Sequence, residues 1–584
     1  MMISRLRQLL ITPIDEAGDR SKQSASILFW LSLSLGFAIY YGCLGLQKAF
    51  RAEHIVQDDA REYVFWMQQF VDPTLFPHDL IADYFKSITP LGYAAIYHLM
   101  ANLGIQPLLL SKILPVAIGV VTTLYGFRVC LKLFPIPVAG FIAMLLLNQS
   151  LWFRDDLSSA TPRAFVYPLF LAFLYYLLRR SRLGVMITIV LQALIYPPLV
   201  LITIAVLFLR LWDWDRWRFH RERIPDFALA AGLGLLALLP YIFSSAEFNP
   251  IVTKAEALTM PELHPGGRHP YFDPNLWRFW LTGQHSGILP PLLPPLIWVG
   301  LGWSIVAQNP SRFPLIKRLN REVVVLAQTA LASLGLFFAA HALLLKLFFP
   351  TRYTTHTWRI VLAIAAAIVL TVLLDAVLLK CEELANVHRW KPLFWRLTLT
   401  GLIGALLILF PSFSPSFPAT NYRISGEGGL YAFLQKQPQD SLIATLSDEA
   451  NSIPTFGQRS VLIGKEYALP FHLGYYRQIR QRSLELIQAQ YSPDLAVVQQ
   501  LIQKYGIDFW LLDRTAFTPE YLLNKSWLQS FQPAFSEAST RLQQGKTSAL
   551  ANRVNDCVAF ESQSLTLLKA TCITQRKTQA RLPE

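Results

Sequence analysis

The sequence predicts an α-helical polytopic membrane protein with about eleven transmembrane helices and a C-terminal soluble α/β domain. Of its 584 residues, 53% are hydrophobic and only 15% are charged, whereas charged residues make up about a quarter of an ordinary soluble protein. Apolar runs long enough to cross a bilayer recur between residues 27 and 411. Beyond residue 425 the pattern changes to short strand-like segments that alternate with Gln-rich helical ones.

The N-terminal segment 1–26 is predicted to be cytoplasmic and to be followed by a first membrane span at 27–46. No small-residue cleavage site follows this apolar run, which distinguishes it from a removed signal peptide. The run 183–211 is too long for one crossing, and Tyr196-Pro197-Pro198 interrupts it, so we expect two short helices there. Further spans are predicted at 107–130, 134–152, 162–178, 226–245, 288–306, 323–348, 358–379 and 397–411.

Clusters of Lys and Arg set the predicted orientation, because these residues collect at the cytoplasmic ends of spans. Arg5, Arg7, Arg20 and Lys22 place the N-terminus inside. Eleven crossings then also place inside the basic residues of segments 179–182, 210–223, 317–321 and 380–396. The net charge of +14 comes from such clusters and does not indicate a nucleic-acid partner. The predicted location is the plasma (inner) membrane, where membrane lipids surround the chain.

With this topology, several segments lie on the exoplasmic or periplasmic side. They comprise loops 47–89, 153–161 and 245–287 of the transmembrane domain 27–411, a very short loop at 351–357, a linker at 412–425 and the exported domain 426–584. Segment 88–104 contains Tyr93, His98 and Asn102 and is expected to lie along the membrane interface, because counting it as a span would invert the later topology.

The exported domain is expected to contain strands near 441–446, 460–463 and 508–512. Cys557 and Cys572 flank a stretch that could fold as a hairpin. In an exported domain they could form a disulfide, and the alternative is a pair of buried free thiols.

Two pairs of adjacent aspartates are candidates for chemistry. Asp58 and Asp59 lie in the first external loop, and Asp155 and Asp156 lie in the second. Adjacent carboxylates repel each other, which raises the pKa of one of them unless a cation or hydrogen bonds intervene. One acid could then act as a general base toward a hydroxyl, or a pair could hold a divalent cation such as Mg or Mn at a phosphate. The alternative is an ordinary hydrated turn in which an aspartate caps a helix.

Basic and aromatic residues on the same predicted side are candidates for substrate binding. Arginine suits a phosphate because its planar guanidinium donates two parallel hydrogen bonds. The alternative is a belt of interfacial side chains that reach toward water. The candidates are Arg163, Arg352, Tyr353, His356 and Arg359, together with the acidic residue Glu62 of the first loop. A metal site in loop 245–287 is conceivable but matches no known spacing; its residues would be His264, Arg268, His269, Asp273 and His285.

The order of these parts resembles the GT-C class of membrane glycosyltransferases: an early span, an external acidic motif, interfacial helices, many spans and an exported C-terminal domain. Segments 453–459, 470–476 and 504–509 also look like the exported domains of bacterial members. The resemblance implies a polyprenyl-phosphate sugar donor and inverting transfer in the exoplasmic leaflet. It also implies that Asp58 or Asp59 is the base, that Asp155 or Asp156 is the second acidic position, and that Arg163 and Arg352 lie near the phosphate.

The function expected on this resemblance is transfer of a sugar to a cell-envelope or lipid glycan acceptor. The sequence has neither the WWD-type signature of oligosaccharide transferases nor the tail domain of protein mannosyltransferases, which argues against a protein acceptor. Two alternatives stay open. One is a transporter or flippase of lipid-linked saccharide, for which Asp375 is the ionisable residue inside a late span. The other is a catalytically silent scaffold.

Overall fold

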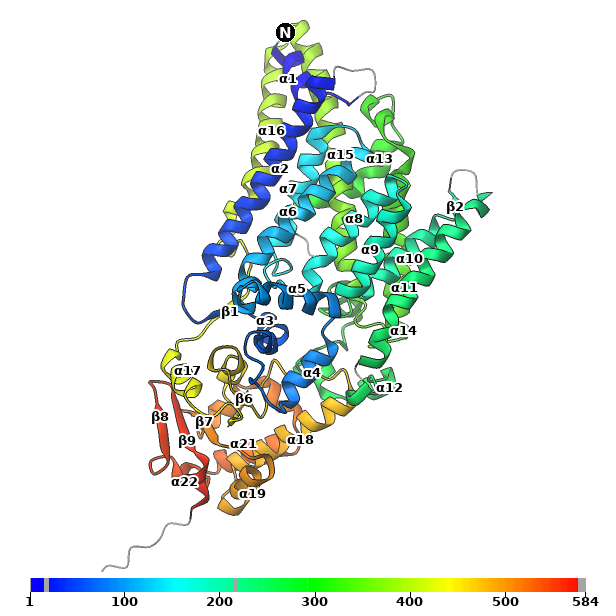
Figure 1. Cartoon of the computed structure of the whole chain (residues 1–584). Coiled ribbons are helices and arrows are strands. Elements are labelled where there is room, and N and C mark those ends of the chain that lie inside the picture. The colour runs from blue at the N-terminus through cyan, green and yellow to red at the C-terminus, as the bar shows by residue number, and fades with distance from the viewer. Residues whose placement is uncertain (1, 15–19, 215–217, 245, 291–292, 576–584) are drawn as a thin grey trace, which may run out of the picture.

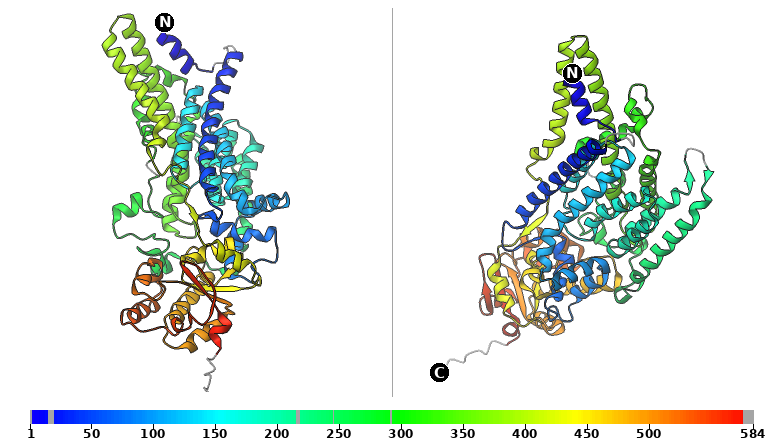
Figure 2. Two further views of the ribbon diagram at one scale, coloured as in Figure 1. Left: turned by 90° about the vertical axis from the view of Figure 1, so that its left-hand side faces the viewer. Right: turned by 45° about the horizontal axis from the view of Figure 1, so that its top comes forward.

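The computed structural model describes residues 2–14, 20–214, 218–244, 246–290 and 293–575. Several predicted segments therefore lie partly outside the described residues: the N-terminal segment 1–26, the spans 226–245 and 288–306, the basic segment 210–223, the loop 245–287 and the domain 426–584. A long helical bundle forms one part of the molecule, and a sheet-containing region caps one end of it (Figure 1). The N-terminus lies at the opposite end of the bundle, and the turned views of Figure 2 agree.

The described residues include six helices that are long and apolar enough to cross a membrane. They are built on α2 (Arg20–Ala49), α6 (Pro107–Leu133), α11 (Ile224–Ser244), α14 (Val324–Ala342), α15 (Thr351–Asn386) and α16 (Trp390–Leu409). Shorter apolar helices pack among them, namely α7 (Pro137–Trp152), α8 (Val166–Leu178), α9 (Arg182–Ile195), α10 (Pro198–Leu209) and α13 (Trp303–Ala307). The predicted class, an α-helical polytopic membrane protein, is confirmed, and the number of crossings stays a prediction.

Prolines mark several helix boundaries as the sequence predicts. Pro107 and Pro137 stand in the first turns of α6 and α7, where a missing backbone N–H costs nothing. The predicted break near residue 196 is also present, since α9 ends at Ile195 and α10 begins at Pro198. Every residue of α7 is buried, so this helix forms the centre of the bundle together with α15, against which it packs.

One predicted loop and two predicted spans differ from the structure. Residues 351–357, expected as an external loop, form the first two turns of α15. Helix α14 ends at Ala342 rather than near 348, and turns with positive φ at Leu345 and Phe348 follow it. The span expected at 288–306 is largely a 3-10 helix over Pro295–Gly302, because the prolines around it remove the backbone donors that a longer α-helix needs.

Loop 47–89 and the segment that follows it fold into short elements between the bundle and the cap (Figure 1). They are β1 (Ile55–Gln57), α3 (Ala60–Tyr63), α4 (Leu80–Ile88) and α5 (Leu91–Asn102), the last within the segment expected at the interface. Strand β1 pairs antiparallel with β4 (Tyr422–Ile424), which lies in the segment expected as a linker. The strand pair therefore fixes the first loop to the start of the C-terminal region.

The C-terminal region contains a five-stranded sheet of order β6-β5-β7-β9-β8. Strands β5 (Leu442–Thr445), β6 (Ser460–Val461) and β7 (Phe509–Asp513) are parallel and fall in the three segments where the sequence predicts strands. Strands β8 (Val558–Glu561) and β9 (Leu565–Lys569) form an antiparallel hairpin, and a Cys557–Cys572 disulfide joins its two ends. The helices around the sheet are α17 (Gly428–Gln435), α18 (Leu473–Gln490), α19 (Leu495–Tyr505), α20 (Pro519–Leu523), α21 (Ala534–Gln543) and α22 (Ala570–Thr574).

Smaller elements complete the chain. Helix α1 (Met2–Leu10) packs against α15 at the end of the bundle away from the cap. Strands β2 (Trp212–Asp213) and β3 (Arg218–Phe219) form a short hairpin between α10 and α11, and α12 (Lys254–Ala257) lies in loop 245–287.

Candidate active site

A cavity of 360 Å³ lies where the bundle, the loops at its capped end and the C-terminal region meet. Its wall includes Asp59 and Glu62 from the first loop, Arg163 at the start of α8 and Arg352 at the start of α15. The C-terminal region contributes Leu469 and Phe471. Four predicted site residues, far apart in sequence, thus share one cavity at the end of the bundle that carries the cap.

A turn at the start of α3 aims Asp59 at this cavity. The side-chain oxygen of Gln57 accepts hydrogen bonds from the backbone N–H groups of Asp59 (2.8 Å) and Ala60 (3.2 Å). Asp59 occupies the N-cap position of α3, but its carboxylate makes no capping hydrogen bond. The expected alternative, an aspartate that merely caps a helix, therefore does not describe Asp59, because Gln57 performs that role.

Arg163 joins the two acidic loops. Its Nη2 lies 2.7 Å from Oδ2 of Asp59 and 2.9 Å from Oδ2 of Asp155. Gln57 Nε2 donates to the same Asp155 oxygen at 3.4 Å. Asp59 and Asp155 keep side-chain exposures of 30% and 21%, so both carboxylates can be reached from solvent. The cation balances two carboxylates that would otherwise repel each other.

The environment favours proton exchange at two carboxyl groups of the cavity wall. Burial raises the pKa of Asp59, and the nearby Asp155 adds to this, while Arg163 opposes it. Burial also raises the pKa of Glu62 well above its usual value, with Arg268 opposing and Glu466 adding to the shift. Glu62 follows Asp59 by three residues, so α3 presents both side chains on one face.

Asp58 points away from the cavity. It forms ion pairs with Arg61 and Arg423, the latter at 3.0 Å, and accepts a hydrogen bond of 3.1 Å from Asn421. Although burial opposes ionisation, these cations hold the pKa of Asp58 below its usual range. Asp58 therefore ties the first loop to the segment around β4.

Asp156 also turns away from the cavity, into the bundle. Its Oδ2 lies 2.5 Å from Nη1 of Arg359, and the Tyr167 hydroxyl lies 3.2 Å from the same nitrogen. The hydroxyl also lies 2.9 Å from Nδ1 of His356. Although burial opposes ionisation, Arg359 holds the pKa of Asp156 far below its usual range. Asp156, His356 and Arg359, all predicted at the site, thus form a buried polar network outside the cavity wall.

The helical start of α15 explains this division. Residues 352, 356 and 359 recur at helical spacing on one face, so Arg359 lies about 10 Å deeper in the bundle than Arg352. Arg352 reaches the cavity wall, where its guanidinium lies 5.6 Å from the centre of the Phe348 ring. Among the described residues, no carboxylate lies within ion-pair distance of Arg352. Tyr353 does not line this cavity but lines a second cavity beside it, and it donates its hydroxyl proton to the Leu347 carbonyl oxygen at 2.8 Å.

Four residues of the long loop 245–287 line the cavity, namely Arg268, His269, Gln284 and His285. Arg268 pairs with Glu62 at 3.1 Å, and His269 and His285 line the wall with ring centres 5.8 Å apart. Burial lowers the pKa of His269 well below its usual value and that of His285 to about 3, so both rings are neutral at pH 7. Both Nε2 atoms are buried without a protein hydrogen-bond partner among the described residues.

The other two residues of the conceivable metal site lie elsewhere. His264 Nε2 is 2.9 Å from the Leu258 carbonyl oxygen, and Asp273 pairs with Arg278 at 2.9 Å. The five residues that the sequence grouped in this loop are therefore not a cluster.

A second cavity of 330 Å³ adjoins the first and shares six wall residues with it, namely Tyr63, Ile88, Pro197, Pro198, Phe348 and Phe471. Its remaining wall is mostly apolar and includes Leu201 of α10, Leu238 of α11 and Leu345 of the turn after α14. A polar chamber and an apolar groove therefore lie side by side.

Several wall residues had no clear signal in the sequence. Gln57, which holds the Asp59 turn but does not line the cavity, also has no signal in the sequence beyond its place directly before the aspartates. Tyr196 was noticed only as a helix break, although it lines the cavity. Phe348 is the last residue of the predicted span 323–348, and Phe349 follows it; both line the cavity because α14 ends at Ala342 and the chain turns after it.

No protein-family model matches the sequence, and no curated protein matches it. Solved structures with the same fold include the oligosaccharyltransferase AglB from Archaeoglobus fulgidus in the apo form, with a TM-score of 0.54 and 13% identity. AglB in complex with an inhibitory peptide and a dolichol-phosphate has a TM-score of 0.53 and 12% identity. Each match covers 87% of this chain and 72% of that one. ArnT from Cupriavidus metallidurans has a TM-score of 0.47 and 12% identity, over 94% of this chain and 99% of that one.

These neighbours are GT-C glycosyltransferases, so the expected GT-C fold is confirmed. A further AglB structure is a complex with Zn and sulfate. In the present chain, however, the Arg163 guanidinium lies between Asp59 and Asp155, where a bridging cation would have to sit. No group of three or more His, Cys, Asp or Glu side chains within the described part of the chain is arranged to hold a metal ion. The residues around Arg163 therefore do not fit a divalent cation at this point.

Proposed function

We propose that this protein is a membrane glycosyltransferase that moves a sugar from a polyprenyl-phosphate donor to a cell-envelope or lipid glycan acceptor on the non-cytoplasmic side. Asp59 is the general base, Asp155 and Arg163 hold it in place, and Arg352 stabilises the departing phosphate. One observation carries the proposal. The wall of a single cavity contains both Asp59, a carboxyl group with a raised pKa, and Arg352, an arginine that has no carboxylate partner among the described residues.

The transfer step follows from these positions. The Asp59 carboxylate accepts the proton of the acceptor hydroxyl while the hydroxyl oxygen forms a bond to the anomeric carbon. The bond from that carbon to the phosphate oxygen breaks, and its electron pair leaves with the phosphate. A base held in place contributes ~10²–10⁴ in rate. Attack opposite the leaving group inverts the anomeric centre.

Arg352 addresses the other half of the reaction. A phosphate leaves without strong acid help but needs its developing charge stabilised. Arg352 is suited to this because a guanidinium is permanently charged and donates to two phosphate oxygens. The wall residues around it, Phe348 and Phe349, are apolar and limit competing water.

The adjoining apolar groove suits the lipid part of the donor. It shares Phe348 and Pro197 with the polar cavity and continues between α10, α11 and the turn at 345–348. A polyprenyl chain needs apolar surroundings next to a site that binds its phosphate. The two cavities side by side therefore match a donor with a charged head and a long apolar tail.

His269 and His285 are assigned to binding the hydroxyl groups of the donor sugar. Neutral imidazoles whose Nε2 atoms lack protein partners can exchange hydrogen bonds with sugar hydroxyl groups. Replacing His285 by Phe keeps a flat ring against Phe349, which it stacks at 4.3 Å, and removes the nitrogen. We expect the discrimination between donor sugars to fall in His285→Phe, and unchanged discrimination would remove the histidine from this role.

The transporter alternative is less well supported. Asp375, the ionisable residue of the late span, pairs with Arg7 of α1 at 2.7 Å, at the end of the bundle away from the cap. A silent scaffold predicts that the loop acids avoid any cavity. Asp58 does so, whereas Asp59 does not.

The test is a transfer assay with the purified full chain, polyprenyl-phosphate sugars and envelope glycans as acceptors. Covalent transfer that is lost in the double variant Asp58→Asn/Asp59→Asn supports the proposal. Movement of the intact donor across sealed vesicles without covalent transfer would favour the transporter. Transfer that survives in the double variant would refute the assigned base.

A further inference from the structure

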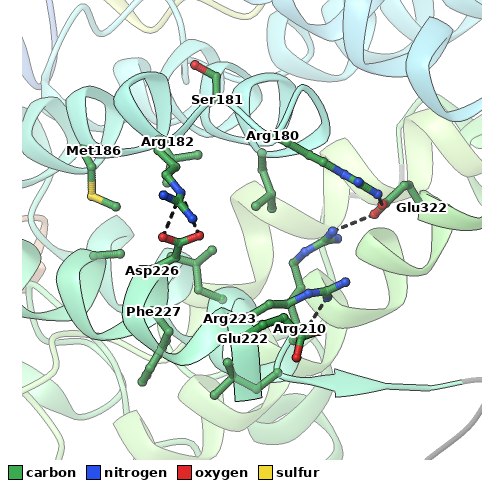
Figure 3. Close-up of a pocket in the computed structure, with 15 residues that line it drawn as sticks. Arg180, Ser181, Arg182, Met186, Arg210, Glu222, Arg223, Asp226, Phe227 and Glu322 are labelled. Carbon is green, nitrogen blue, oxygen red and sulfur yellow. Dashed lines mark hydrogen bonds and ion pairs between the residues drawn. The ribbon is translucent and has the colours of Figure 1, made fainter. Parts of the chain in front are cut away.

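A cavity of 480 Å³ lies at the other end of the bundle, away from the candidate active site. It is enclosed by the turn between α8 and α9, the end of α10, the start of α11 and Glu322 just before α14 (Figure 3). None of its lining residues takes part in the proposed transfer reaction. Leu211, which lines the cavity, directly precedes β2, so the β2–β3 hairpin begins at the cavity wall.

Four arginines and three carboxylates line this cavity, so its side chains carry a net charge of +1. Arg210 lies 2.7 Å from Glu322, and Arg180 lies 3.7 Å from the same carboxylate. Arg182 pairs with Asp226 at 3.0 Å. Figure 3 shows these guanidinium groups turned toward the space between the helices. One acid, Glu322, thus serves two arginines and leaves both incompletely neutralised.

Arg223 is the cation without a carboxylate. Its Nη1 donates a hydrogen bond of 2.8 Å to the backbone carbonyl oxygen of Arg210. In the ranges that the structure covers, no carboxylate lies within 4 Å of it. Arg223 is half-buried. Burying part of its charge costs free energy, which an anion bound inside the cavity would offset.

The remaining wall is apolar and includes Val185, Leu211 and Ala230, all buried. Next to it the hairpin exposes Trp212 and Phe219, whose ring centres lie 4.8 Å apart, and Trp214 is exposed nearby. Exposed tryptophans next to arginines are typical of the boundary between the bilayer and water. The occupant that fits such a place has an anionic head and an apolar body.

We propose that this cavity binds the phosphate head of an anionic glycerophospholipid from the adjacent leaflet. Arg223 and Arg210 contact the phosphate, Arg182 and Arg180 contact it from the rim, and the acyl chains lie along the apolar wall. Basic pockets between membrane helices recognise anionic lipid heads in this way. The bound lipid joins the α8–α9 turn to α11 and α14 and stabilises the end of the bundle away from the reaction.

The experiment uses the purified full chain in nanodiscs of neutral phosphatidylcholine, to which phosphatidylglycerol is added. Native mass spectrometry counts bound phosphatidylglycerol, and thermal unfolding reports stabilisation. We expect saturable binding that weakens at least ~tenfold in Arg223→Gln, because a hydrogen bond between charged groups is lost. Arg223→Gln leaves the Arg210–Glu322 ion pair in place, so the variant should fold.

Arg389→Gln is the matched control, because Arg389 is an exposed arginine between α15 and α16 and does not line the cavity. It should bind phosphatidylglycerol like the wild type. Equal loss in Arg389→Gln and Arg223→Gln would show a general effect of surface charge and overturn the proposal. Binding of glycerol 3-phosphate as tight as that of the lipid would also overturn it, since the apolar wall would then contribute nothing. Lipid counting by native mass spectrometry and thermal unfolding are both independent of transferase activity.

Discussion

The side-chain oxygen of Gln57 accepts a hydrogen bond of 2.8 Å from the backbone N–H of Asp59. The same oxygen accepts from Ala60, and the other end of the Gln57 amide reaches Asp155 at 3.4 Å. A single neutral side chain thus satisfies the start of α3 and lies next to both acids. The carboxylate of Asp59 is left free to face Arg163 and the cavity.

Removing this amide should misplace the base. In Gln57→Ala the backbone N–H groups of Asp59 and Ala60 lose their acceptor and Asp155 loses a donor, at a cost of ~1 kcal/mol to the turn, so we expect the transfer rate to fall about five- to tenfold. Steady-state kinetics measure the change. Gln69→Ala, in the same loop but bonded to the Leu75 carbonyl oxygen, is the control and should keep its rate. An unchanged rate in Gln57→Ala would contradict the positioning role.

Arg352 should matter more than other arginines near the site. Arg352→Gln removes the cation from the cavity wall, and we expect kcat/KM for the lipid-phosphate donor to fall ~10²–10³-fold, as when a donor to a developing charge is lost. Arg423→Gln removes a 55% exposed guanidinium that pairs with Asp58 outside the cavity. Arg423→Gln should lower kcat/KM only slightly. Equal losses of kcat/KM in the two variants would contradict the role of Arg352 at the phosphate.

The acid limb of the pH profile should follow Asp59. A base must be ionised, so activity rises with pH through its pKa, and burial places that pKa above the ordinary value of an aspartate. Asp155→Asn removes a neighbouring negative charge and should move the limb to lower pH. Arg163→Gln removes a positive charge and should move it to higher pH. The pH dependence of kcat/KM measures both shifts, and shifts of the same sign would contradict the assignment.

Chelators should have little effect on transfer. Arg163 lies 2.7 Å and 2.9 Å from the two acids and supplies the positive charge between them. Dialysis against EDTA followed by assay with and without Mg²⁺ or Mn²⁺ tests this. Activity that disappears with EDTA and returns with either ion would show that the guanidinium moves aside for a metal.

The buried network below the site should contribute to stability. Arg359→Met leaves the Asp156 carboxylate buried without its cation, which costs ~3–5 kcal/mol. The double variant Asp156→Leu/Arg359→Met removes both charges and should recover part of the loss. Thermal unfolding in detergent compares the two, and equal destabilisation would show that the ion pair is not what matters.

Much of the bundle could be predicted because bilayer thickness requires long apolar runs. The break at Tyr196-Pro197-Pro198 was predictable because proline removes backbone donors. The end of α14 at Ala342 was not, since Leu343 to Phe349 are as apolar as the helix before them. Residues 351–357 were mistaken for a loop because their polarity comes from an inward-facing network.

The site was predicted at the level of segments. The arrangement of spans brought the two acidic loops, Arg163 and Arg352 to one end of the bundle. Which aspartate of each pair lies beside Arg163 depends on the contacts of its own turn. In the first pair, the hydrogen bond between the Gln57 side chain and the Asp59 N–H sets the turn. In the second pair, the ion pair with Arg359 holds Asp156 inside the bundle. Contacts between residues hundreds of positions apart leave no local signal.

The most direct measurement is the single-turnover transfer rate of Asp59→Asn with donor and acceptor both saturating. Asparagine keeps the size of the side chain and removes its ability to accept a proton, and Asp58→Asn is the neighbouring control. The account predicts that Asp59→Asn slows transfer ~10²–10⁴-fold with donor binding unchanged, whereas Asp58→Asn stays within a few-fold of the wild type. A wild-type rate in Asp59→Asn, or the larger loss in Asp58→Asn, would contradict it.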